Sequence, residues 1–211
     1  MEETDKIVKP TQPWWKNGWV AGLLVLGLLH ATGLAVHVQA GFQRVLLVTG
    51  LFNPDLVPEG QRLEADLRFS VVDAAGDVRT PGSSSGEVRF INFWATWCAP
   101  CLAEMPAIAR LHDDYTDRVE FIMVSMDEEL DLATRFLESK GYGLTPVRPA
   151  SPIPQSLTTG LIPTTVVVDR NGRIAVHEAG MADYDSRSFR DVLDRLLDEP
   201  KPEIRQASLR R

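Results

Sequence analysis

The stretch from Val88 to Pro106, VRFINFWATWCAPCLAEMP, constrains the fold of this chain more than any other. Its first part, Val88–Trp94, is rich in Val, Ile, Phe and Trp, which predicts a buried strand. The only two cysteines among the 211 residues, Cys98 and Cys101, come next. The residues that follow them, Leu102–Tyr115, predict a helix. The cysteines therefore fall where a strand ends and a helix begins.

This position gives the cysteine pair a chemical role. The free N–H groups and the dipole at the start of a helix favour negative charge, so they stabilise the thiolate of Cys98. Cys101 lies one turn further along and is close enough to form a small disulfide ring with Cys98. Two cysteines are too few for a scaffold held together by disulfides. The Cys-x-x-Cys spacing is typical of a catalytic dithiol.

Two alternatives for the cysteines are inert core thiols and half of a zinc site. A structural zinc site needs four ligands, and the sequence has no second Cys-x-x-Cys and no His-x-x-x-His to complete one. The four histidines are scattered, at His30, His37, His112 and His177. We therefore expect neither a metal nor another cofactor. The net charge of −7 and the lack of Lys/Arg clusters also argue against nucleic acid as a partner.

The N-terminal region predicts a membrane anchor. Residues 1–17 are polar and broken by prolines, which predicts a disordered tail. The next segment, Gly18–Val38, carries no charged residue. It is long enough for a membrane-spanning helix, which needs ~20 residues. We predict a transmembrane helix over residues 18–40. Tryptophans at its start and lysines before it favour an N-terminus inside the cell and the bulk of the protein outside.

Two other interpretations of this segment remain open. Val38-Gln39-Ala40 could form the small-residue site at which a signal peptide is cleaved. The segment could also be a buried core helix, although little chain surrounds it at this terminus. A second apolar run, Val45–Phe52, is too short to span a membrane. We expect it to lie along the membrane surface, within a juxtamembrane amphipathic segment and linker over residues 41–61.

Residues 62–198 predict one α/β domain, and residues 199–211 a flexible tail. A hairpin over Leu63–Val72 and Val78–Thr80 is expected first. Strands then alternate with helices, which predicts one mixed sheet with helices on both faces. The expected strands after the hairpin are Val88–Trp94, Val119–Met126, Thr164–Asp169 and Ile174–Glu178. The expected helices are Leu102–Tyr115, Glu128–Lys140 with Asp127 as its cap, and Asp183–Leu197, with a short irregular helix at best over Ser151–Thr159.

The motifs resemble those of a known family. Phe93–Cys101, FWATWCAPC, resembles the active-site signature of thioredoxin-fold proteins. Leu102–Pro106, LAEMP, and the preceding Asn92 are more similar to the membrane-anchored TlpA/ResA group of thiol:disulfide oxidoreductases. Gly160–Thr165, GLIPTT, is similar to the family's cis-proline loop. The resemblance covers about Leu63–Leu197 and implies a thioredoxin fold with an N-terminal β-hairpin extension.

The resemblance implies a role for each matching residue. Cys98 is expected to attack a substrate disulfide as a thiolate, and Cys101 to resolve the mixed disulfide. Pro163 is expected to be cis and to place the backbone of Ile162 beside the cysteines, where an extended substrate segment can pair with it. The substrate-binding residues expected on this basis are Trp97, Pro100, Ile162 and Pro163.

One position departs from thioredoxin itself. Where thioredoxin has a buried acid before the Phe-Trp pair, this chain has Asn92, which cannot exchange a proton. Glu104, one turn after Cys101, is the family's alternative acid. A partly buried carboxyl group there would have a raised pKa and would help to deprotonate Cys101, so we expect Glu104 to be catalytic. The alternative is an exposed helix residue that the dipole favours.

The expected function is that of an oxidoreductase tethered to the inner (cytoplasmic) membrane, with its catalytic domain on the periplasmic side. We expect it to reduce protein disulfides, for example in cytochrome c maturation, and to be re-reduced by a membrane electron-donor protein. The first alternative is a peroxiredoxin-like peroxidase. The second is a non-catalytic module that binds copper or thiols.

Overall fold

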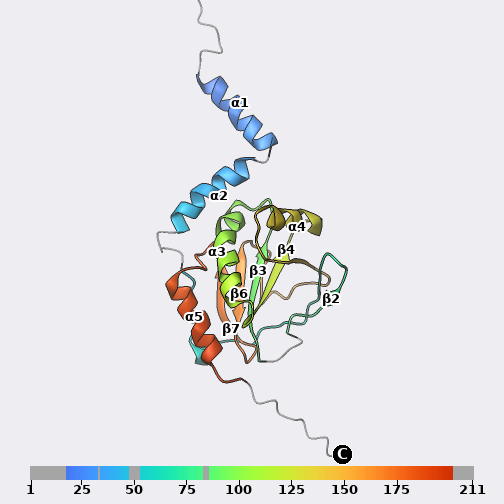
Figure 1. Cartoon of the computed structure of the whole chain (residues 1–211), viewed down its shortest axis with the longest axis vertical. Helices are drawn as coiled ribbons and strands as arrows, with labels where there is room; N and C mark the ends of the chain where they lie inside the picture. The colour runs from blue at the N-terminus through green and yellow to red at the C-terminus, as the bar shows by residue number, and fades with distance from the viewer. Residues whose placement is uncertain (1–17, 33, 48–52, 83–85, 202–211) are drawn as a thin grey trace, which may run out of the picture.

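The computed structural model describes residues 18–32, 34–47, 53–82 and 86–201. They contain one mixed seven-stranded sheet with strand order β2-β1-β5-β4-β3-β6-β7 (Figure 1). The strands are β1 Val71–Val72, β2 Val78–Arg79, β3 Val88–Trp94, β4 Val119–Ser125, β5 Pro146–Pro149, β6 Thr164–Val168 and β7 Ile174–Ala179. The helices are α1 Gly18–Ala31, α2 Leu34–Leu47, the short 3₁₀ helix η2 Glu59–Gln61, α3 Ala99–Tyr115, α4 Leu130–Ser139 and α5 Arg187–Asp198.

Strand β3 lies inside the sheet, between β4 and β6, and every one of its residues is buried. It pairs in parallel with β4 and antiparallel with β6. Both of its faces are covered, which explains why its sequence is almost continuously apolar rather than alternating. The strand predicted over Val88–Trp94 is confirmed.

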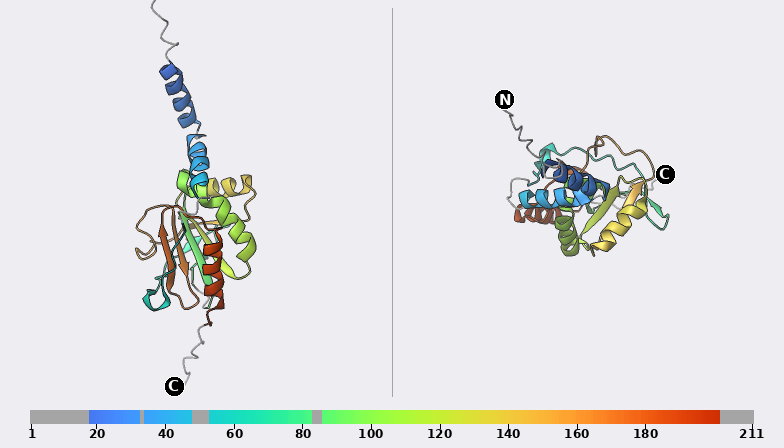
Figure 2. Two further views of the ribbon diagram at one scale, coloured as in Figure 1. Left: turned by 90° about the vertical axis from the view of Figure 1, so that its left-hand side faces the viewer. Right: turned by 90° about the horizontal axis from the view of Figure 1, so that it is seen from above.

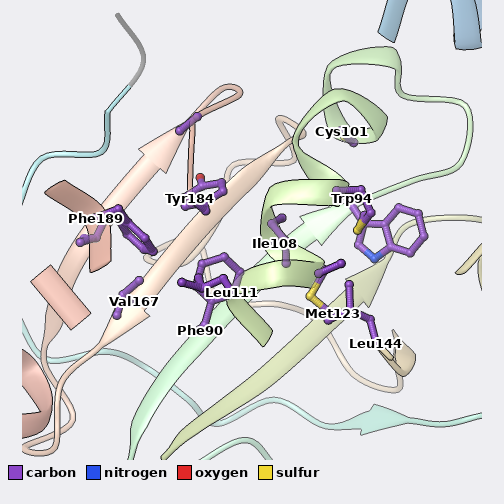
Figure 3. Packing of buried hydrophobic residues seen from close by; sticks show 14 of the residues in the cluster. Phe90, Trp94, Cys101, Ile108, Leu111, Met123, Leu144, Val167, Tyr184 and Phe189 are labelled. Atoms are coloured by element: carbon purple, nitrogen blue, oxygen red, sulfur yellow. The ribbon is translucent and has the colours of Figure 1, made fainter. Parts of the chain in front are cut away.

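The main helices all pack against one face of the sheet, whereas the sequence predicts helices on both faces. Residues of α3, α4 and α5 share a single buried cluster with alternate residues of the central strands. Figure 2 shows these three helices along the same side of the sheet, and Figure 3 shows Phe90 and Met123 of the sheet facing Ile108 and Leu111 of α3. The chain steps from β3 to β4 to β5 in one direction, and right-handed crossovers in one direction place α3 and α4 on the same face.

Extended chain covers the opposite face. A second buried cluster joins Ile91 and Val124 of the central strands to Phe69, which precedes β1, and to Leu157. The segment 150–163 around Leu157 contains turns and bends but no helix. Its prolines remove backbone donors that a helix would need, which explains why even the irregular helix expected over Ser151–Thr159 is missing.

The predicted N-terminal hairpin is confirmed in a shorter form. Strand β1 pairs antiparallel with β2 across the turn Asp73–Asp77, and its other edge pairs with β5. Each strand of the hairpin has two residues. Most of the predicted first strand, Leu63–Val72, instead crosses the sheet as extended chain, with an isolated bridge between Glu64 and Arg173.

The N-terminal region forms two helices, α1 and α2, whereas the sequence predicts a single helix over residues 18–40. Helix α1 ends where the amide and hydroxyl groups of Thr32 both donate to the carbonyl of Leu28. Among the residues described, neither α1 nor any other helix combines the length with the apolar character that crossing a bilayer requires. The tail predicted over residues 1–17 lies outside the described residues. So do residues 202–211 of the tail predicted over residues 199–211, and residues 48–52 of the predicted surface segment.

Helix α2 packs against α3 (Figure 1). Ala40 and Leu47 are buried in the same cluster as α3, and Val36 packs against that cluster. These residues are spaced four and seven apart, so they lie on one face of α2. Leu47 lines a pocket with Ala103 and Ala107 of α3. Helix α2 thus joins the N-terminal region to the helix that carries the cysteines.

Candidate active site at the start of helix α3

Cys98 and Cys101 form a disulfide, with the two Cα atoms 5.2 Å apart. Cys98 is the N-cap of α3, and its sulfur accepts the backbone N–H of Cys101 at 3.3 Å. Helix α3 begins at Ala99, three residues earlier than the sequence predicts, with Pro100 in its first turn, where a missing N–H is tolerated. The cysteines therefore lie at the strand–helix junction, as predicted.

The two cysteines differ in their exposure. Cys98 is 6% exposed and Cys101 is completely buried. Trp97 is 61% exposed and stands at the surface next to Cys98, whereas Trp94 is buried and packs against Phe136 of α4. Pro100 is partly exposed. A substrate from solution therefore meets Trp97, Pro100 and Cys98 before it can reach Cys101.

Asp127 holds the loop that leads into the cysteines. Its carboxylate accepts the backbone N–H of Thr96, at 3.1 Å to Oδ2, and the Thr96 hydroxyl group at 2.7 Å. The hydroxyl group of Ser125 also donates to it at 2.8 Å. The sequence predicts Asp127 as a helix cap, but the N-cap of α4 is Glu129. Asp127 instead ties the end of β4 to the loop that follows β3.

The peptide bond between Ile162 and Pro163 is cis, as predicted. Thr164, which follows it, pairs with Phe93 near the end of β3, so the cis-proline loop lies at the end of the sheet that carries the cysteines. The carbonyl of Pro163 accepts the N–H of Gly180 at 2.9 Å, which fixes the loop against the chain after β7. Pro163 is buried and Ile162 partly exposed.

Glu104 is completely buried in α3, three residues after Cys101. Its Oε1 accepts the side-chain amide of Asn92 at 2.9 Å, and its Oε2 accepts the backbone N–H of Ala182 at 3.3 Å. Burial raises the pKa of Glu104 to about 8, against the opposing effect of these two hydrogen bonds. The alternative of an exposed helix residue is excluded. Residues three apart on a helix share a face, so the carboxyl group lies near Cys101.

Asn92 joins this carboxyl group to the neighbouring strand. Its amide nitrogen donates both to Glu104 and to the hydroxyl group of Thr165, each at 2.9 Å. Tyr184 is also buried here, and burial, with the negative charge of Glu104, raises its pKa well above the ordinary value. The sequence does not predict Thr165, Ala182 or Tyr184 as site residues. The one available signal is a hydroxyl residue two positions after Pro163.

No group of three or more His, Cys, Asp or Glu side chains in the described part of the chain is arranged to hold a metal ion. The site contains a disulfide at a helix start, a buried carboxylic acid three residues further along the same helix and a cis-proline loop at the same end of the sheet. This arrangement can exchange thiols with disulfides and can take up the proton that such an exchange releases.

Comparison with known proteins agrees with this chemistry. The family model described as Redoxin matches residues 60–193. The chain is 27% identical over 155 residues to the thiol-disulfide oxidoreductase ResA of Geobacillus kaustophilus, covering 72% of this chain and 80% of that protein. It is 30% identical over 142 residues to ResA of Halalkalibacterium halodurans, covering 62% of this chain and 76% of that protein.

A solved structure shows the same fold. The secreted thiol-disulfide isomerase of Corynebacterium glutamicum superposes with a TM-score of 0.55 at 22% identity, covering 69% of this chain and 92% of that chain. The thioredoxin-like α/β fold implied by the motifs is thereby confirmed. The chain belongs to the Redoxin family and is a thiol-disulfide oxidoreductase of the ResA type, with Cys98–Cys101 as its active-site disulfide.

Proposed function

We propose that this enzyme reduces protein disulfides, with Cys98 as the nucleophile and Cys101 as the resolving thiol. The observation that carries the proposal is the place of the Cys98 sulfur, which caps α3 and accepts the N–H of Cys101. In the reduced enzyme the same N–H and the helix dipole would stabilise a thiolate at Cys98. Cys98 is also the less buried of the two cysteines.

The reaction then proceeds in two exchanges. The Cys98 thiolate attacks one sulfur of the substrate disulfide, the substrate S–S bond breaks, and the released thiolate takes a proton from water. Cys101 next loses its proton and attacks the Cys98 sulfur, which expels the second substrate thiolate. The substrate gains two electrons and two protons, and the enzyme is left with the Cys98–Cys101 disulfide.

Glu104 is the proposed acceptor of the Cys101 proton. Proton transfer is most efficient between groups of similar pKa, and an ordinary thiol has a pKa of about 8.5. Burial brings the pKa of Glu104 to about 8, close to that value. A carboxyl group of ordinary pKa would be a much weaker base towards a thiol.

The proposed substrate-binding site comprises Trp97, Pro100, Ile162 and Pro163. Trp97 offers an exposed aromatic surface beside Cys98, and Leu161 adds a second exposed apolar side chain on the cis-proline loop. An extended substrate segment would pair with the backbone of Ile162 and lie between these two side chains. The proposed substrate is therefore a protein whose disulfide lies in an exposed, extended segment with apolar neighbours.

We place the enzyme at the inner membrane, with the catalytic domain on its periplasmic side. Helix α1 supports this placement because most of its large apolar side chains are exposed, among them Trp19, Leu23, Leu24, Leu26 and Leu28. Exposed apolar side chains of this kind need an apolar partner. Because the segment Gly18–Val38 carries no charge, the interior of a lipid bilayer is a suitable one. A membrane electron-donor protein would re-reduce the disulfide, and cytochrome c maturation is a process that such a reductase would serve.

Membrane placement can be tested on the full chain. We expect it to sediment with membranes and to resist extraction by alkaline carbonate, with the domain digested by protease added from the periplasmic side. Replacing Leu24 and Leu26 with lysine should release the protein, whereas the same replacement at Val78 and Leu132, which are exposed in the catalytic domain, should not. Release of the wild-type chain by carbonate would contradict the tether.

Trapping the substrate tests the reductase function. The Cys101→Ser variant lacks the resolving thiol, so it should accumulate a mixed disulfide between Cys98 and its substrate, visible as a slower band without reductant. The Cys98→Ser variant is the matched control and should trap nothing. Trapping by Cys98→Ser rather than Cys101→Ser would reverse the two roles. Rapid consumption of hydrogen peroxide would favour the peroxidase alternative, and Cu(I) binding without disulfide reduction would favour the copper alternative.

A further inference from the structure

Three polar residues form a row across neighbouring strands, on the face of the sheet that α3 covers. Asn92 of β3 lies directly opposite Thr165 of β6, and Thr165 lies directly opposite Glu178 of β7. Residues directly opposite one another in a sheet point to the same face. Glu104 approaches this row from α3 and accepts the amide of Asn92. At the Asn92 end of the row lies the fully buried Glu104, and at its other end lies Glu178, which is partly exposed.

Asn92 uses both N–H donors of its amide in this row. An amide nitrogen carries two hydrogens, and here one is directed to Glu104 and the other to the hydroxyl group of Thr165. The nitrogen is therefore held between two fixed acceptors. Because Asn92 cannot titrate, its contribution to proton transfer must come through the carboxyl group that it contacts.

We propose that Asn92, anchored on Thr165, is a positioning residue that holds the Glu104 carboxyl group and sets the pH range in which it exchanges a proton with Cys101. The inference rests on the proposed role of Glu104 as the proton acceptor of Cys101. It adds a second residue, Asn92, whose removal alters that step through its hydrogen bond to the Glu104 carboxyl group.

The groups around Glu104 act on it in opposite directions. Asn92 and the N–H of Ala182 donate to the carboxylate and favour its charged form. The negative charge of Glu178, on β7, disfavours the charged form, as does burial. Tyr184 faces Glu104 from the segment before α5 and is neutral at ordinary pH. Strands β3 and β6 present the uncharged Asn92 and Thr165, and α3 carries Cys101 three residues before Glu104.

Because these groups shift the ionisation of Glu104 in opposite directions, removing each of them should shift the pH dependence of the reaction in a different direction. In the full-length protein, Cys98 is linked to glutathione and the release of glutathione by Cys101 is timed across a range of pH. The rate should rise as Glu104 ionises. Asn92→Leu removes a hydrogen bond to the carboxylate, so the midpoint should move up by about one pH unit. Glu178→Gln removes a repelling charge, so the midpoint should move down.

Two matched substitutions of Thr165 test the same inference if Asn92→Leu folds poorly. Thr165→Val deletes the anchor with little change of shape and should move the midpoint up, whereas Thr165→Ser keeps a hydroxyl group and should leave it in place. Thermal unfolding of each variant controls for loss of structure. A purely structural role would slow the reaction without moving its pH midpoint.

Two results would overturn the proposal. The first is an unchanged midpoint in both Asn92→Leu and Thr165→Val, and the second is a shift of Asn92→Leu in the same direction as Glu178→Gln. Titration of the Glu104 carboxyl carbon by nuclear magnetic resonance checks the coupling without any reaction, and its midpoint should follow the same signs. Failure of the proposed function would look different, because Glu104→Gln would then leave the pH profile of glutathione release unchanged.

Discussion

A buried carboxylic acid, Glu104, is the residue on which the proposed proton transfer depends. Glu104 has no exposed surface, yet both of its oxygens have hydrogen-bond donors. A buried carboxyl group is tolerated when it is hydrogen-bonded and able to stay neutral, and burial raises the pKa of Glu104 to about 8. The group is therefore mostly neutral at pH 7 and can act as acid or base near that pH.

The raised pKa predicts how the stability of the oxidised protein depends on pH. Below the unfolded value of 4.5 both states hold the proton, so Glu104 imposes no charge penalty. As the pH rises from there towards 8, the unfolded chain releases the proton while the folded protein keeps it, so the free energy of unfolding falls. The glutamine side chain of the Glu104→Gln variant does not titrate, so it adds no such pH dependence to the free energy of unfolding.

The measurement is urea unfolding of the oxidised wild type and the Glu104→Gln variant at several pH values. The free energy of unfolding of the wild type, relative to that of the variant, should decrease between about pH 5 and about pH 8 and then level off. An opposite slope, with the wild type gaining stability as the pH rises, would mean that the carboxyl group is charged in the folded protein.

At the scale of elements, the strand and helix around the cysteines could be predicted from the sequence because their signals are local. Val88–Trp94 is apolar enough to be a strand in almost any fold, and Cys98 caps the helix that follows it. The contacts that complete the site are not local. Ala182 reaches Glu104 through a backbone N–H, which any residue type would supply, so the sequence carries no mark of it.

Asp127 shows how a correct local pattern can have a different use. An acidic residue just before a helix is typical of an N-cap, and the sequence predicts that role for it. The parallel pairing of β3 and β4 brings Thr96 within reach, and the Asp127 carboxylate accepts its N–H and hydroxyl groups instead. The position of β5 beside β4 likewise decides that α3 and α4 share one face, because both crossovers then run in one direction. Neither outcome can be read from the segments separately.

The packing of α2 on α3 gives a prediction at this scale. Ala40 is 3% exposed on the face of α2 that meets α3, while its neighbour Gln39 is exposed. Ala40→Glu would bury a charge in that contact and should detach α2, so amide hydrogen exchange in the first half of α3 should increase. Gln39→Glu adds the same charge on the exposed face and should change nothing. Equal exchange in both variants would argue that α2 does not cover α3.

At the scale of the whole molecule, an ion-pair network joins segments far apart in the sequence. Arg62 pairs with Asp169, in the turn between β6 and β7, at 2.9 Å, and with Glu199, just after α5, at 2.7 Å. The side chains of Arg62 and Asp169 are 4% and 0% exposed. The network fixes the segment before the sheet to the β6–β7 turn and to the end of the last helix.

Breaking this network should destabilise the protein. Arg62→Ala leaves Asp169 buried with one fewer cation, and removal of one partner from a buried ion pair costs about 3 kcal/mol in the free energy of unfolding. Arg68→Ala removes a cation from the exposed pair with Asp66 and should leave the free energy of unfolding unchanged within error. Chemical unfolding compares the two, and a smaller loss for Arg62→Ala than for Arg68→Ala would refute the structural role of the network.

The reduction potential of the Cys98–Cys101 pair decides whether this pair is a reducing dithiol, as we claim. Equilibrating the full-length protein with dithiothreitol buffers of known potential, and following the thiols by alkylation, gives this value in one titration. A reductant should lie near the thioredoxin value of about −270 mV. A potential near about −120 mV, the value of a dedicated oxidant, would contradict the claim and make the protein a donor of disulfides instead.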